Sequence, residues 1–205
     1  LIYFDGEILT ENLFIFLVVL GLYLLHSARG ETRKRWFGAG ISLGLALITR
    51  PTIGLFLPFA ALGPLVCCGK RRIAPVLLVI AGIVLPVVPV TIHNYVVSGE
   101  FIPVVWQAGI NFYLGNNAAA NGWSATSPEI RKDWWGGYHD MIAIPRTVLG
   151  RQPTYGEVSA FWISKGLKFI RSEPLSWLRL MLKKVALFWN SREFPNNQDY
   201  NFVRS

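Results

Sequence analysis

The sequence predicts an all-α membrane protein, a multi-span helical bundle with an extracytoplasmic loop region and interfacial amphipathic helices. Of the 205 residues, 52% are hydrophobic, and the formal net charge is +8. The first half contains uncharged runs long enough to cross a bilayer core of about 30 Å. Basic residues gather between these runs. The positive charge therefore indicates a membrane surface, and we expect no nucleic-acid partner.

Residues 1–95 are predicted to form the membrane bundle. The basic loop RGETRKR ends the first apolar run, and the basic turn GKRR precedes the last one, in which Pro86 and Pro89 are expected to kink the helix. Four spans are expected, at about 8–28, 36–49, 52–68 and 73–95.

The apolar run from Trp36 to Cys68, in which Arg50 is the one charged residue, is interpreted as two spans. Its 33 residues would form a helix of about 50 Å, which is too long for one crossing at ordinary tilt. One crossing would also put the two basic loops on opposite sides of the membrane, whereas such loops tend to stay cytoplasmic. Dividing the run at Arg50 and Pro51 removes both problems and brings Arg50 to the external surface. In the half before Arg50, Gly40 and Gly44 predict close packing on another helix.

The polar residues of the apolar segments are predicted to meet at one external rim. Glu11 lies near the start of the first span, Arg50 at the tip of the hairpin, and His93 and Asn94 near the end of the fourth span. A rim with both charge signs is suited to a charged headgroup whose apolar tail lies between helices. The alternative is that helix ends simply tolerate polar residues, because a terminal side chain can reach water.

Residues 96–205 are predicted to be extracytoplasmic. Gly, Asn and Pro clusters from Ser98 to Asp140 indicate turns and short extended pieces rather than long helices. The stretch GINFYLGNN combines aromatic and amide side chains, a combination that can bind polar ligands. Seven of the eight Trp residues fall between Trp106 and Trp189. They are suited to stacking on sugar rings, or equally to an aromatic belt at the membrane interface.

Two helices are predicted near the end of the chain, at about 155–171 and 174–189. Thr154 and Glu157 fit a capping box that opens the first, and Pro174 fits the first turn of the second. The second helix carries cations on one side, so it is expected to lie along the interface. Lys183 is a candidate contact for a lipid phosphate, with plain surface anchoring as the alternative. The apolar face of this helix comprises Leu175, Leu178, Met181, Leu182, Val185 and Phe188, and the cations are Arg179, Lys183 and Lys184.

Three segments together resemble the middle of bacterial GT-C membrane glycosyltransferases, the family similar to dolichyl-phosphate-mannose protein mannosyltransferases and aminoarabinose transferases. They read FDGEILTENLFIFLVVLGLYLL, GAGISLGLALITRPTIGLFLP and HNYVVSGEFIPVVWQAGINFYLGNNAAANG. The resemblance implies a multi-pass enzyme of the plasma or inner membrane. Such an enzyme transfers a hexosyl or pentosyl group from a polyprenyl-phosphate donor to an extracytoplasmic protein or glycolipid acceptor.

The resemblance also implies roles for particular residues. Arg50 matches the basic residue placed near the lipid phosphate, and Glu11 matches the Glu of the family's TEN motif. Where the family has an Arg before the NY pair, this chain has His93, so a phosphate contact there requires a protonated imidazole. The family's catalytic carboxylate lies in an earlier external loop. The chain, which begins without Met, is expected to start after that loop, and neither Asp5 nor Glu7 is nominated as the base.

Two other functions share this topology and stay open: a transporter or flippase of lipid-linked sugars, and a polysaccharide ligase or polymerase. Transporters commonly place their binding groups near the membrane midplane, whereas the polar groups here collect at one face, which favours an enzyme. No zinc spacing, P-loop or dinucleotide-binding glycine pattern occurs. No cofactor is expected, and the sequence does not decide whether a divalent metal is required.

Overall fold

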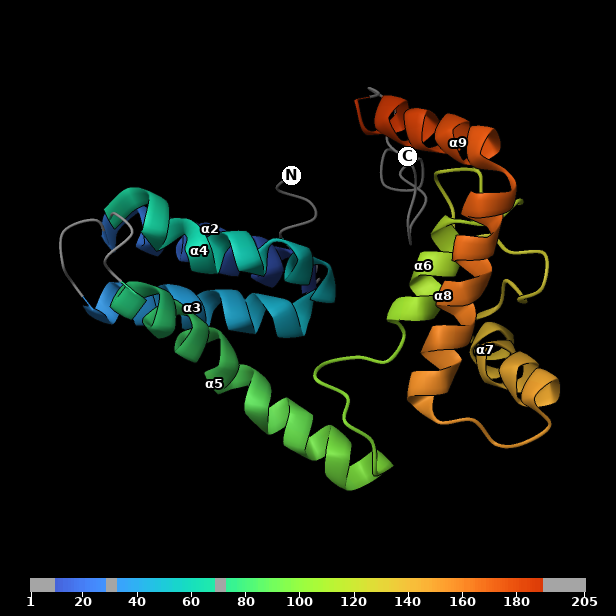
Figure 1. Ribbon diagram of the computed structural model, residues 1–205, viewed down its shortest axis with the longest axis horizontal. Helices are drawn as coiled ribbons and strands as arrows, with labels where there is room; N and C mark the ends of the chain where they lie inside the picture. The colour runs from blue at the N-terminus through green and yellow to red at the C-terminus, as the bar shows by residue number, and fades with distance from the viewer. Residues whose placement is uncertain (1–9, 29–32, 69–72, 190–205) are drawn as a thin grey trace, which may run out of the picture. The chain divides into compact units, whose positions relative to one another are not determined.

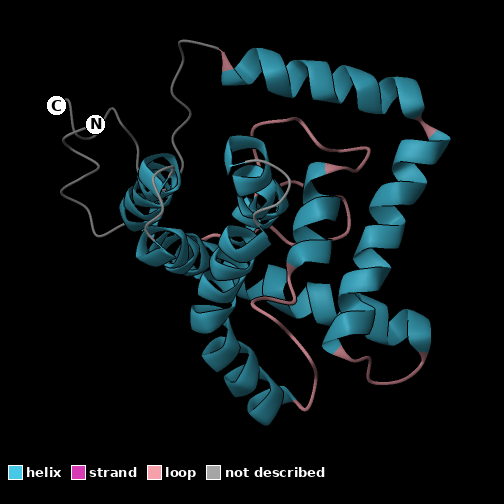
Figure 2. Ribbon diagram, turned by 60° about the vertical axis from the view of Figure 1, so that its left-hand side comes forward, coloured by secondary structure: helices cyan, strands magenta, loops and turns pink. Residues whose placement is uncertain are grey.

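The computed structural model describes residues 10–28, 33–68 and 73–189. Within these ranges all regular structure is helical and no strand occurs, as Figure 2 shows. This confirms the all-α class. The chain divides into two compact units, Leu1–Val105 and Trp106–Ser205, which are described separately below.

The first unit consists of apolar helices that run back and forth (Figure 1). At one end of the α2–α3 pair, Arg50 forms an ion pair with Glu11. At the other end, the Nη1 of Arg35 donates to the carbonyl oxygen of Ser27 at 2.8 Å. The two helices are therefore antiparallel. The elements of the unit are α2 (Thr10–Ser27), α3 (Arg33–Thr49), η2 (Pro51–Leu55), α4 (Leu57–Cys68) and α5 (Ile73–Ser98).

Two helices in the described part of the chain, α2 and α5, are long and apolar enough to cross a membrane. Only 11% and 17% of their most apolar windows is buried inside the protein. The core helices of a water-soluble protein would be mostly buried, so these exposed apolar faces favour a membrane protein. Helix α5 runs through both Pro86 and Pro89 without interruption.

Helix α3 packs against α5 through glycines. A Cβ atom on Gly40 would lie 2.3 Å from the carbonyl oxygen of Val79, and one on Gly44 would lie 2.5 Å from that of Ile83. The reciprocal residue on α5 is Gly82, whose Cβ would lie 2.3 Å from the carbonyl oxygen of Phe37. The two backbones are thus in direct contact, which confirms the close packing predicted from Gly40 and Gly44.

The apolar run from Trp36 to Cys68 is broken at the predicted place. Helix α3 ends at Thr49, Arg50 is extended with φ −142° and ψ 100°, and Pro51 opens the 3-10 helix η2. The α-helix resumes only at Leu57, later than the expected start at residue 52. At the second position of α4, Pro58 lacks only an N–H group that would have no acceptor within the helix, so it suits the start of α4.

In the second unit, helices α6, α7 and α8 pack around a small aromatic core. The buried residues Ile110 and Tyr113 of α6 meet Val158 and Trp162 of α8, and side chains of α7 pack against them. Gly109 brings the backbones of α6 and α8 together, since its Cβ would lie 2.0 Å from the carbonyl oxygen of Ser159. The elements are α6 (Ala108–Gly115), α7 (Trp134–Leu149), α8 (Tyr155–Ser172) and α9 (Pro174–Phe188).

The helices expected at 155–171 and 174–189 are confirmed as α8 and α9, and both arms of the predicted capping box are present. The expectation of turns and extended pieces up to Asp140 is wrong for α7, which begins at Trp134. Asp133 caps this helix by accepting from the backbone N–H of Gly136 at 2.6 Å. The Gly pair that suggested a turn therefore belongs to the first helical turn.

Candidate functional site

The predicted rim residues Arg50 and Glu11 come together in the first unit. Glu11 lies in the first turn of α2, and Arg50 directly precedes η2. The Nη2 group of Arg50 donates to Oε1 of Glu11 in an ion pair. The two side chains are 43% and 41% exposed, so a ligand can still reach them. A guanidinium has five N–H donors in a planar fork, and Arg50 therefore has donors for a second anion.

The other two rim candidates, His93 and Asn94, lie on α5. The Nδ2 of Asn94 donates to the carbonyl oxygens of Ile102 and Val104, both at 3.0 Å, and so fastens the segment that follows α5. His93 is exposed. Among the described residues, no hydrogen bond or ion pair joins His93 or Asn94 to the Arg50–Glu11 pair. A shared role for all four residues stays a prediction. Asp5 and Glu7 lie outside the described residues.

The stretch GINFYLGNN forms α6 and its C-terminal end in the second unit. The buried Asn117 donates through Nδ2 to the carbonyl oxygens of Tyr113 and Thr126, at 3.0 and 2.8 Å, and its Oδ1 accepts from the N–H of Ala119. The Oδ1 of Asn116 accepts from the indole Nε1 of Trp177. Both amides are thus occupied in holding the loop after α6 and helix α9 in place.

Beside these amides lies an open pocket of about 260 Å³, which we call the Lys184 pocket. The Nζ of Lys184, on α9, donates at 2.6 Å to the carbonyl oxygen of Gly115, the last residue of α6. Burial lowers the pKa of the Lys184 ammonium. The pocket is lined from α6, the following loop and α9 by Asn111, Leu114, Gly115, Ala120, Gly122, Trp123, Ser124, Ala125 and Lys184.

Lys183, the cation nominated from the sequence, points elsewhere. It is exposed, whereas Lys184 is half-buried and lines the pocket. Trp177 and Leu180, two turns and one turn before Lys184, face the rest of their unit. Lys184 follows them at spacings of seven and four, while Lys183 follows Arg179 at four. The sequence does not show which apolar row of α9 faces inward, so the sequence reasoning named Lys183 and missed Lys184.

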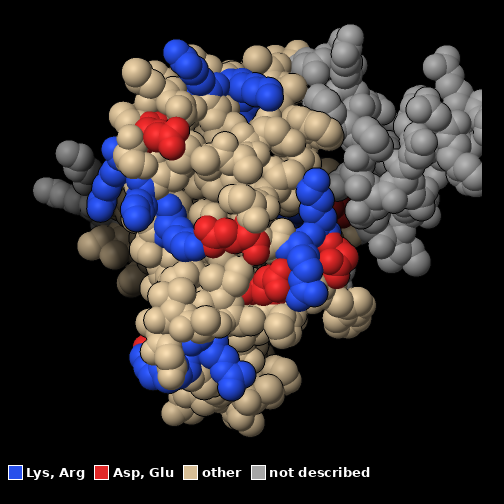
Figure 3. Space-filling view, turned by 90° about the vertical axis from the view of Figure 1, so that its right-hand side faces the viewer, with Lys and Arg blue, Asp and Glu red and all other residues tan. Residues whose placement is uncertain are grey.

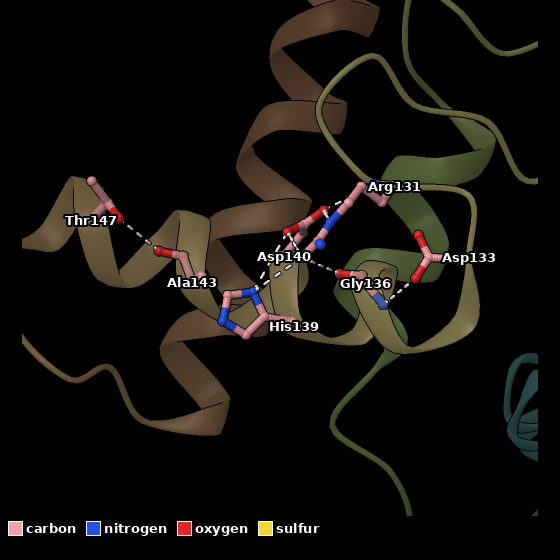
Figure 4. A network of polar contacts seen from close by, with 7 residues as sticks. All are labelled: Arg131, Asp133, Gly136, His139, Asp140, Ala143 and Thr147. Atoms are coloured by element: carbon pink, nitrogen blue, oxygen red, sulfur yellow. Dashed lines mark hydrogen bonds and ion pairs between the residues drawn. The ribbon is translucent and has the colours of Figure 1, made fainter.

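A second polar cluster lies at the start of α7 (Figure 4). The Nε and Nη2 of Arg131 donate to Oδ2 and Oδ1 of Asp140 at 2.9 and 2.8 Å, and the backbone N–H of Arg131 adds a third bond at 3.0 Å. The side-chain hydrogen bonds from Arg131 hold the pKa of the Asp140 carboxyl well below its usual range. His139 lies beside them, its Nδ1 3.4 Å from Nη2 of Arg131. This carboxylate fastens the preceding loop to α7, a role unsuited to a general base.

The tryptophans divide between core and surface. Trp162 is fully buried and donates through Nε1 to the carbonyl oxygen of Met141 at 2.9 Å, so it is a core residue and not a stacking surface. Among the tryptophans whose burial is described, Trp123, Trp135 and Trp189 are more than half exposed. Of these, Trp123 lines the Lys184 pocket.

Charge alone does not mark a binding surface on the face shown in Figure 3. Basic side chains are spread over it in separate patches, with acidic side chains between them. Within the described residues, no three His, Cys, Asp or Glu side chains gather as a metal ion would require. The Arg50–Glu11 pair and the Lys184 pocket are therefore the two candidate sites. The chain matches no protein-family model, no curated protein and no solved structure.

Proposed function

We propose that the chain is part of a multi-pass glycosyltransferase of the plasma or inner membrane. It transfers a sugar from a polyprenyl-phosphate donor to an extracytoplasmic acceptor, and Arg50 holds the donor phosphate. The observation that carries the proposal is the position of Arg50. Arg50 is the one residue between α3 and η2, and its guanidinium is half-exposed beside apolar helices. The ion pair with Glu11 already holds it in place.

The chemistry requires such a cation. When the glycosyl bond breaks, negative charge develops on the leaving polyprenyl phosphate, and a fixed cation in a partly dehydrated site stabilises that charge better than one in bulk water. Arg suits this task because its fork donates two hydrogen bonds to a phosphate. Glu11 fixes the side chain in advance, which lowers the cost of ordering it when the donor binds.

The apolar surroundings suit the lipid part of the donor. Both α2 and α5 expose large apolar side chains, among them Phe16 and Leu85. An apolar pocket of about 270 Å³ lies among α2, α3 and α4, with Leu25, Trp36 and Phe59 in its lining. An isoprenoid chain requires contact surfaces of this kind, since every CH₂ removed from water contributes about 0.8 kcal/mol.

The proposed topology has four crossings, formed by α2, α3, α4 with η2, and α5. The basic loops lie on the cytoplasmic side, and residues 96–205 lie outside. Helix α4 alone has 12 residues, or about 18 Å, so its crossing requires η2 and a locally thinned bilayer. Helix α9 exposes Leu175, Leu182 and Phe188, which supports its placement along the outer membrane surface, where Lys183 meets lipid phosphates.

The test replaces Arg50 in the full-length protein, reconstituted in nanodiscs. We expect Arg50→Ala to weaken binding of a polyprenyl phosphate and to lower transfer from membrane donors by about 10²- to 10³-fold. Arg50→Lys keeps the charge but loses the fork, so an intermediate loss is expected. Arg35→Ala is the matched control, since it removes an exposed Arg that bonds a backbone carbonyl at the opposite end of α3.

Unchanged binding and transfer in Arg50→Ala would refute the phosphate role. Equal losses in Arg50→Ala and Arg35→Ala would mean that removing an Arg near either end of α3 disturbs the bundle, and the role of Arg50 would then be structural. If the wild-type protein moves polyprenyl-phosphate sugars from one leaflet of a vesicle membrane to the other without transferring the sugar, the protein is a flippase instead.

A further inference from the structure

Within the described residues, no carboxylate neutralises the charge of Lys184. Its Nζ is half-buried against Gly115 and donates one hydrogen bond, to a carbonyl oxygen. An ammonium has three donors. No ion pair to Asp or Glu engages it within the described part of the chain. A partly dehydrated cation without an anionic partner is costly, unless a ligand supplies the anion.

The loop after α6 is built to hold an indole beside this cation. The Oδ1 of Asn121 accepts from the backbone N–H groups of Trp123 and Ser124, at 3.1 and 2.9 Å. Between them, Gly122 has a φ of +89°, a conformation that favours glycine. A Cβ there would lie 3.4 Å from Cγ of Lys184, so the lysine stem packs against this turn. The cation and the indole are therefore positioned by one small structure.

The polar side chains of the pocket can all donate hydrogen bonds. The hydroxyl of Ser124 accepts from Nδ2 of Asn121 at 2.7 Å, which leaves its own proton to donate. Asn111 adds an amide one helical turn before Gly115. Among the described residues of the lining there is no Asp or Glu. An exposed indole attracts the polarised C–H groups of a sugar ring through its negatively charged face, and the donors suit an anionic substituent.

From this arrangement we infer that the Lys184 pocket binds a single sugar unit that carries an anionic group, a carboxylate or a phosphate, with Lys184 on the anion and Trp123 against the ring. The pocket volume of about 260 Å³ lies below the range of about 300 to 1,000 Å³ found for drug-sized ligands. One monosaccharide therefore fits better than an oligosaccharide. The inference concerns the second unit alone, and it rests on the proposed function only for the choice of a sugar.

The test measures binding to the full chain in nanodiscs, using saturation-transfer NMR and tryptophan fluorescence. The probes are glucuronate, glucose 6-phosphate, glucose and inorganic phosphate. We expect at least one of the two acidic sugars to bind more tightly than both glucose and inorganic phosphate. Removing the cation in Lys184→Gln should weaken that binding about 10- to 100-fold, because a hydrogen bond to a charged group is lost. Lys168→Gln, which removes an exposed lysine of α8 outside the pocket lining, should bind as the wild type does.

Two further variants distinguish loss of the binding site from a folding defect in Lys184→Gln. Lys184→Arg keeps the charge and should retain most of the binding. Ala125 is an exposed residue of the pocket lining and takes no part in the hydrogen bond from Lys184 to Gly115. Ala125→Trp adds an indole to the lining and should abolish binding, while the circular dichroism and the thermal unfolding midpoint stay unchanged.

Four results would overturn the inference: no binding of either acidic sugar, equal binding of glucose, equal binding of inorganic phosphate, or full binding in Ala125→Trp. The proposed function is tested separately. Loss of transfer in Arg50→Ala with no sugar in the pocket would leave the glycosyltransferase proposal standing and refute this one. A sugar bound in the pocket of a protein without transferase activity would support this inference and refute the glycosyltransferase proposal.

Discussion

The contact between α3 and α5 makes a quantitative prediction about Gly40. A Cβ at this position would lie 2.3 Å from the carbonyl oxygen of Val79 and 2.8 Å from Cα of Gly82. Both neighbours are backbone atoms, so no side-chain rotation relieves the clash. Ordinary contact begins at 3.4 Å, and Gly40→Ala must therefore push the helices apart by roughly 1 Å, at a cost of about 1 to 3 kcal/mol.

Gly38 provides a matched control on the same helix. A Cβ there would lie 3.6 Å from Cδ1 of Leu24, an ordinary contact with a flexible side chain. Both Ala substitutions gain the same helix propensity, about 1 kcal/mol. The difference between the two variants is therefore the backbone clash alone, and Gly38→Ala should be as stable as the wild type or more so.

The assay is unfolding in mixed micelles by titration with a denaturing detergent, followed by far-ultraviolet circular dichroism. We expect Gly40→Ala to unfold at a lower detergent fraction than Gly38→Ala, with a free-energy gap of about 1 to 3 kcal/mol. Equal midpoints for the two variants would refute the direct backbone contact between α3 and α5.

Two further predictions concern α8 and α9. Hydrogen bonds from Arg151 lower the pKa of the Glu157 carboxyl from 4.5 to about 2. The ionised Glu157 carboxylate therefore stabilises the protein fully above about pH 4.5, and this stabilisation is lost as the pH falls towards 2. The difference in thermal unfolding midpoint between the wild type and Glu157→Gln should disappear over that range. A difference that stays constant with pH would contradict this. On α9, we expect a spin label on Leu182→Cys in nanodiscs to be more accessible to oxygen than to a nickel chelate, and a label on Ser176→Cys to show the reverse. Both labels in water would show that α9 does not lie on the membrane.

Local signals in the sequence predicted much of the fold. The side chains of a capping box bond to backbone atoms within three residues, so Thr154 and Glu157 sufficed to place the start of α8. Proline acts just as locally, which is why Pro51 and Pro174 marked the break after α3 and the start of α9. Gly40 and Gly44 indicated a close helix contact because little else explains two small residues four apart in an apolar helix.

Helix α7 escaped prediction because its breaker residues have tertiary roles. A Cβ on Gly136 would lie 2.5 Å from Oδ2 of Asp133, so the glycine makes room for the capping carboxylate. Pro145 lies inside the helix and is fully buried, where packing offsets the lost hydrogen bond. Composition alone reads such residues as turns. The Arg131–Asp140 pair was equally hidden, because two charges nine residues apart look like ordinary surface residues.

The choice between neighbouring lysines shows where periodicity stops being sufficient. Helix α9 carries two apolar rows: one contains Leu178 and Leu182, and the other contains Trp177 and Leu180. The first row is exposed and the second faces the rest of the unit. Because either row could have packed inward, the sequence analysis placed Lys184 on the exposed polar side of the helix and predicted no pocket there. The partner of the inner row, the indole acceptor Asn116, lies 61 residues earlier in the chain.

Arg50 was predicted more completely because its position depends on lengths and charges that need no partner. A run of 33 residues is too long for one crossing, and a proline after a central Arg fixes the place of the break. The ion pair with Glu11 adds a restraint that the sequence could only suggest. Because the charges of Arg50 and Glu11 are paired, their fields cancel at a distance and attract anions in bulk water only weakly. An anion that arrives within hydrogen-bond reach still meets an oriented guanidinium, and that favours a ligand delivered along the membrane by its lipid tail over a soluble phosphate.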